Sequence, residues 1–73
     1  MVRVDLLHGE MARAGYNRTS LSKKIGISPN TFLRKEKLGI FGSDEIVKIV
    51  QLCNIENPMP IFFPEFVTRD ATR

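Results

Sequence analysis

The residues of this chain best suited to chemistry are basic, and they are concentrated between Arg18 and Lys37. These twenty residues include six Lys and Arg side chains and one acid, Glu36, for a local charge of +5, whereas the rest of the chain has −2. Such side chains bind anionic groups through charge-assisted hydrogen bonds. The pattern therefore favours a polyanionic partner, although basicity alone does not separate a nucleic acid from a membrane surface or from a basic face that is only solvated.

The sequence offers few residue combinations suited to catalysis or to metal binding. The chain shows no Ser/His/acid set, no glycine-rich phosphate loop and no paired carboxylates in a plausible cleft, and it has one histidine, His8, and one cysteine, Cys53. We therefore expect no enzymatic activity, no cofactor and no metal site. Cys53 lies in an apolar helical pattern and is expected to be a buried hydrophobe rather than a reactive thiol.

Apolar residues at helical spacing, separated by capping residues and glycines, predict an all-α domain of four helices and a short fifth. The helices are expected over about residues 4–14, 18–25, 29–37, from a cap at Ser43 to about Cys53, and 58–63. Asn17 and Ser28 are predicted N-caps, Pro29 suits a first helical position, and Gly26 suits a left-handed helix end. The second and third helices would thus be joined by a tight glycine turn.

The expected core is made of the apolar faces of these helices. It comprises Leu6, Leu7, Met11, Ala14, Tyr16, Leu21, Ile25, Ile27, Phe32, Ile46, Ile49, Val50 and Cys53, widened by Val47 and Leu52, with Leu38 as an anchor at the end of the third helix. Residues 1–63 are expected to form one domain and residues 64–73 a short tail.

The spacing resembles the phage repressor and Cro-like helix-turn-helix family, also called the xenobiotic-response-element family. The matching residues, within positions 3 to 63, are Ala14-Gly15-Tyr16, Leu21-Ser22, Ile25-Gly26-Ile27-Ser28, Thr31-Phe32, Arg34, Gly39, Ile46, Ile49 and Val50. The resemblance implies a lambda-repressor-like fold whose third helix enters the major groove of double-stranded DNA. It also implies a transcriptional regulator, most simply a prophage or mobile-element repressor acting as a dimer on an operator.

The resemblance places the first turns of the third helix against base edges, at Pro29, Asn30, Thr31, Leu33 and Arg34. Asn30 matches the two-point pattern of adenine and Arg34 that of guanine. Three alternatives stay open: Leu33 in the core, Asn30 as a capping residue, and Arg34 on a phosphate or in solvent. Phosphate contacts are expected from Arg18, Thr19, Lys23, Lys35 and Lys37.

The last apolar segment is a candidate dimer contact, with Phe63 and Phe66 at its centre. Leftover apolar side chains usually mark contacts, although closure of the core is an alternative for Ile61 and Phe62. No signal peptide or membrane-spanning run is recognisable, so a cytoplasmic protein is expected. The alternative function is a protein-interaction adaptor or anti-repressor that keeps this fold without binding DNA.

Overall fold

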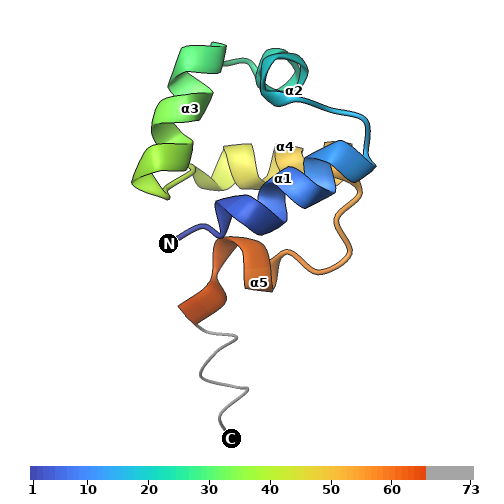
Figure 1. The fold of residues 1–73 in the computed structure, drawn as a ribbon, viewed down its shortest axis with the longest axis vertical. Helices are drawn as coiled ribbons and strands as arrows, with labels where there is room; N and C mark the ends of the chain where they lie inside the picture. Colours follow the sequence, from blue (N-terminus) through green and yellow to red (C-terminus); the bar gives the residue numbers. More distant parts are fainter. Residues whose placement is uncertain (66–73) are drawn as a thin grey trace, which may run out of the picture.

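Five helices account for nearly all the regular structure of residues 1–65, the part of the chain that the computed structural model describes (Figure 1). They are α1 (Val4–Arg13), α2 (Arg18–Ile25), α3 (Pro29–Leu38), α4 (Ser43–Cys53) and α5 (Met59–Phe62). Residues 1–65 contain no strand. The expected all-α class, with four helices and a short fifth, is confirmed.

The helices are arranged around the pair α1 and α4, which pack against each other. Helix α2 packs against both α3 and α4, and α5 packs against α1. Figure 1 shows the consequence: α2 and α3 lie together on one side of the α1–α4 pair, and α5 lies on the other. The basic segment between positions 18 and 37 is therefore one end of the domain.

Local capping chemistry sets the limits of α2 and α3 as the sequence predicts. The Asn17 side chain accepts from the backbone N–H of Ser20 at 2.8 Å, and the Ser20 hydroxyl accepts from the N–H of Asn17 at 2.9 Å. Ser28 Oγ accepts from the N–H of Thr31 at 3.1 Å, with Pro29 at the first helical position. Gly26 ends α2 with φ +87°, a left-handed conformation that costs other residues energy.

The predicted cap of α4 is wrong by one residue. Gly42 is the N-cap and Ser43 is already the first helical residue. Gly42 has no side chain to accept a hydrogen bond, so Glu45 reaches back from inside the first turn and its carboxylate accepts from the Gly42 N–H at 2.7 Å. A negatively charged side chain is favourable at this positive end of a helix.

The core is continuous from α1 to α5. Leu7, Leu21, Phe32, Ile49 and Cys53 are fully buried. The ring of Phe41 packs edge-on against two other rings, Phe32 at 5.3 Å and Phe62 at 6.4 Å between centroids, and so joins α3 to α5. Ile61 and Phe62 are buried, which supports core closure as their role.

Three residues expected in the core are instead exposed: Leu6 is 38%, Val47 53% and Leu38 57% accessible. Leu6 faces an open pocket between α1 and α5, and Val47 lies on the outer side of α4. Leu38 is the last residue of α3, and the buried positions of that helix are Phe32 and Glu36, one turn apart. The expected anchor at the end of α3 is therefore one half-turn away from where the helix meets the core.

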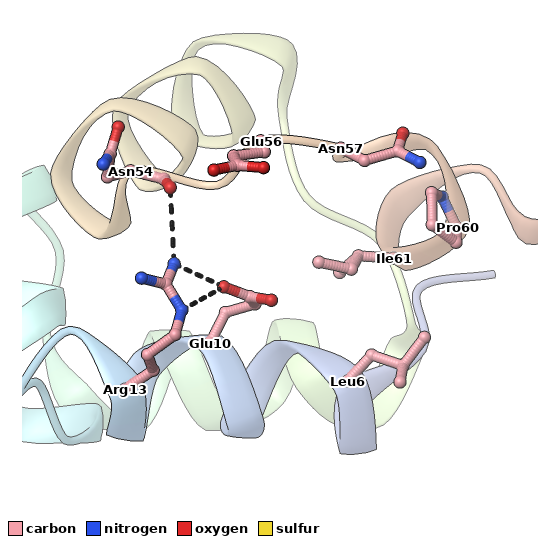
Figure 2. Close-up of a pocket in the computed structure, with 8 residues that line it drawn as sticks. All are labelled: Leu6, Glu10, Arg13, Asn54, Glu56, Asn57, Pro60 and Ile61. Carbon is pink, nitrogen blue, oxygen red and sulfur yellow. Dashed lines mark hydrogen bonds and ion pairs between the residues drawn. The ribbon is translucent and has the colours of Figure 1, made fainter.

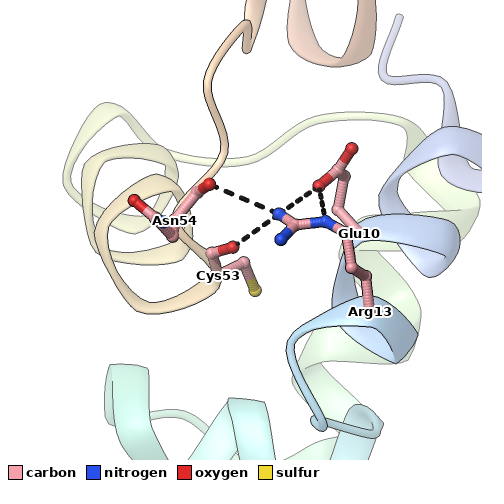
Figure 3. A network of polar contacts seen from close by, with 4 residues as sticks. All are labelled: Glu10, Arg13, Cys53 and Asn54. Carbon is pink, nitrogen blue, oxygen red and sulfur yellow. Dashed lines mark hydrogen bonds and ion pairs between the residues drawn. The ribbon is translucent and has the colours of Figure 1, made fainter.

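A single arginine ties α1 to the end of α4 (Figure 3). Arg13 Nη2 donates to the carbonyl oxygens of Cys53 at 2.9 Å and Asn54 at 3.3 Å, while its Nε donates to Glu10 at 2.9 Å. Carbonyls at a helix C-terminus have no partner within the helix and bear partial negative charge, so a cation there is stabilising. Glu10 in turn holds the guanidinium in place.

The requirement for glycine at position 26 is testable with a matched pair of variants. A Cβ at Gly26 or at Gly9 meets no atom within 4 Å, so the two sites differ in backbone conformation alone, and only Gly26 has a positive φ. We expect Gly26→Ala to lower the free energy of unfolding by about 1 kcal/mol. Gly9→Ala, within α1, should raise it by up to about 1 kcal/mol. Urea unfolding of both proteins checks this, and a shift in the same direction for both would contradict it.

Burial should also make Cys53 inert in the folded protein. Its side chain is fully buried, and removal from water raises the pKa of the thiol, an effect that the nearby Arg13 opposes more weakly. A higher pKa leaves less of the nucleophilic thiolate at neutral pH. We expect alkylation by iodoacetamide to be about a hundredfold or more slower than in urea, because it requires opening of the domain. Rapid alkylation under native conditions, followed by mass spectrometry, would contradict this.

Candidate nucleic-acid interface

The basic end of the domain consists of α2, the turn Gly26-Ile27-Ser28, and α3. Ser22, on the side of α2 that faces the core, is fully buried, and its hydroxyl donates to the carbonyl of Thr19 at 2.9 Å. Its polar group is therefore satisfied within its own helix. The two helices pack directly against each other, which makes this end one surface rather than two separate segments.

Helix α3 has an inner and an outer side. Phe32 and Glu36 are buried, four residues apart, whereas Asn30, Arg34 and Lys37 are exposed. Positions 30, 34 and 37 follow the i, i+4, i+7 spacing that places side chains on one helical face. Of the five predicted base contacts, Asn30 and Arg34 are thus exposed to solvent.

The other three predicted base contacts lie at the margins of this face. Pro29, Thr31 and Leu33 are half-buried. The Thr31 hydroxyl accepts from Ser28 Oγ at 2.9 Å and so belongs to the cap of α3. Leu33 is partly buried, so part of its side chain is withdrawn from water and part stays accessible to solvent.

The predicted phosphate contacts divide into two groups. Thr19, Lys23 and Lys37 are exposed, and no side-chain hydrogen bond or ion pair to other residues of the 1–65 region occupies them. Lys35 and Arg18 are partly buried and paired: Lys35 Nζ lies 3.1 Å from a carboxylate oxygen of Glu45, and Arg18 Nε lies 2.7 Å from one of Glu36. The pairing of these two cations is not apparent from the sequence.

Glu36 is the residue that the sequence interpretation missed. Its side chain is only 4% exposed, and its two oxygens have different partners. Oε1 accepts from Arg18 Nε, and Oε2 lies in hydrogen-bond contact with His8 Nε2. The only signal in the sequence was its position one turn after Phe32, on the inner side of α3.

An open pocket of about 530 Å³ lies between α1, the segment after α4, and α5 (Figure 2). Its lining residues come from outside α2 and α3. Its wall is lined by Leu6, Glu10, Arg13, Asn54, Glu56, Asn57, Pro60 and Ile61. Arg13 is already held by Glu10 and the end of α4. Within the described region no three His, Cys, Asp or Glu side chains gather as metal ligands would.

The candidate dimer contacts are only partly visible. Phe63, just after α5, is 40% exposed, and Phe66 lies outside the described residues. Nearby, the N-terminal ammonium of Met1 forms an ion pair with Glu65, which joins the first residue to a position in the expected tail. No helix in residues 1–65 has the length and apolar character needed to cross a membrane.

Comparison with protein-family models, with curated protein sequences and with solved structures finds no match to this chain.

Proposed function

We propose that this protein binds double-stranded DNA in a sequence-specific manner and regulates transcription, with α3 in the major groove. The observation that supports this most is the position of Glu36, the one acid between positions 18 and 37. Glu36 is buried and paired, so the exposed charges between positions 18 and 37 are all positive. They are Lys23, Lys24, Arg34 and Lys37. A solvent-exposed face that carries only positive charges attracts a phosphate backbone more strongly than a surface of mixed charge does.

The outer face of α3 supplies groups that distinguish bases. Asn30 can donate to and accept from adenine, and Arg34 can donate twice to guanine, through major-groove edges. Four residues of helix span about 6 Å, which corresponds to roughly two base-pair steps. The two side chains would therefore contact different base pairs of one short site.

Phosphate contacts would fix the helix in the groove. Thr19 lies in the first turn of α2, where backbone N–H groups and the helix dipole favour an anion. Lys23 and Lys37 add exposed ammonium groups on α2 and α3. A domain with one recognition helix covers few base pairs, so a dimer on an inverted-repeat operator, formed through the region around Phe63, is part of the proposal. Such a dimer would act as a repressor by covering a promoter.

Binding should depend steeply on salt. If about four to six phosphates are neutralised, the logarithm of the association constant should fall with the logarithm of salt concentration with a slope of about −4 to −5 per subunit. Fluorescence anisotropy with a duplex selected from random DNA measures the slope, and sedimentation of the complex gives the number of subunits. A flat salt response, or no binding to any duplex pool at low salt, would reject DNA binding and favour the adaptor function.

Base contacts and phosphate contacts should respond differently to substitution. Asn30→Ala and Arg34→Ala should each cost about 1–3 kcal/mol on the selected duplex and relax base preference, with little change on random DNA. Lys23→Ala and Lys37→Ala should weaken both by similar factors. Lys24→Ala removes the same charge from the same segment and is the matched control, with the smallest expected effect. Equal losses on both duplexes for Arg34→Ala would identify Arg34 as a phosphate contact.

A further inference from the structure

The buried carboxylate of Glu36 is held at both oxygens by residues from two other helices. Arg18 of α2 donates its Nε to Oε1 at 2.7 Å, and His8 of α1 contacts Oε2 through Nε2. An ionised carboxylate withdrawn from water is costly unless its partners are well placed. The two contacts leave Glu36 little freedom to turn, because releasing either oxygen would leave it unsatisfied in a buried position.

The contact with Glu36 uses only one edge of the Arg18 side chain. A guanidinium is a planar group with five N–H donors, and a bond from Nε fixes the orientation of the plane. Within residues 1–65, the Arg18 side chain makes no other hydrogen bond or ion pair, so neither Nη group is engaged. The side chain is 39% exposed and borders a hollow of about 200 Å³ that is also lined by Tyr16 and Asn17.

We propose that Glu36 is a positioning residue for phosphate binding: it orients the Arg18 guanidinium through Nε so that both Nη groups can donate to one phosphate of the DNA backbone. The inference rests on the proposed function and assigns roles within that site. Arg18 would contact the phosphate, Glu36 would fix the direction of its donors, and His8 would hold Glu36 from the other side.

A simple electrostatic role for Glu36 makes the opposite prediction. If the carboxylate only neutralised Arg18, its removal would free a cation and strengthen DNA binding. If it orients Arg18, its removal weakens binding although the domain becomes more positive. The sign of the effect therefore separates the two.

The test compares Glu36→Gln with Glu45→Gln, using anisotropy on the selected duplex and on random DNA. Both variants make the same charge change and remove an acid paired with a predicted phosphate contact, since Glu45 pairs with Lys35. We expect Glu36→Gln to bind both duplexes about tenfold more weakly, the loss of about one charge-assisted hydrogen bond. Its salt slope should become shallower by about 0.9, the value for one phosphate. Glu45→Gln should bind as tightly as the parent protein or more tightly.

A double-mutant cycle identifies the residue through which Glu36 acts. In the Arg18→Ala background, Glu36→Gln should cause little further loss, because its target is already absent. Additive losses would mean that Glu36 acts through the fold, and binding by Glu36→Gln as tight as by Glu45→Gln would mean that it only neutralises charge. Either result overturns the proposal.

Arg18→Lys provides a second test, which does not require substitution of the buried acid. Lysine keeps the charge, but its donors all lie on one nitrogen, so it lacks the planar pair of Nη groups that would contact one phosphate at two points. We expect it to lose most of what Arg18→Ala loses, with the unfolding transition of each variant measured alongside. Parental affinity in Arg18→Lys would overturn the proposal while leaving DNA binding intact. Absence of binding by the parent protein itself would instead reject the proposed function, and this inference with it.

Discussion

An ionised carboxylate inside a protein costs several kcal/mol unless charged or hydrogen-bonding groups meet it, and this constraint applies to Glu36 of α3. Its partners come from two other helices, His8 on α1 and Arg18 on α2. A rotation of α3 about its axis would separate Glu36 from both and expose Phe32, which is fully buried one turn earlier. The apolar and the ionic contact therefore select the same rotation of α3, and this rotation determines which residues face solvent.

The same burial shapes the electrostatics of the surface. On the outer side of α3, the carboxylate of Glu36 would face an approaching anion directly and repel it. With Glu36 inside and paired, the exposed charges of that helix are those of Arg34 and Lys37. Among the cations between positions 18 and 37, Arg18 is the one that pairs with Glu36, and it does so through one edge of its guanidinium. A basic surface and a buried acid are thus compatible within one short helix.

Features of the fold that depend on neighbouring residues could be predicted from the sequence. Asn17, Gly26 and Ser28 set both ends of α2 and the start of α3 through contacts only a few residues away, and these three limits are confirmed. Features that depend on tertiary packing could not be predicted. Glu36 meets His8 across 28 positions of the chain, and helical periodicity places Glu36 on the same side of α3 as Phe32 without showing which groups it meets there. Leu6 fits the apolar stripe of α1 but faces an open pocket, because α5 does not cover it.

The inner side of α3 contributes to folding and its outer side to the proposed recognition of DNA, but the division is not complete. Asn30 and Arg34 make no side-chain hydrogen bond or ion pair with other residues in the 1–65 region, so their replacement removes little that stabilises the domain. In the proposed complex with DNA, a substitution on the outer side would therefore change base preference without a change of fold. Arg18 and Lys35 differ, because each is paired with a carboxylate that also caps or packs a helix. At these two positions a change in the proposed phosphate binding and a change in stability are physically linked, whereas the unpaired cations around them can be replaced with less effect on stability.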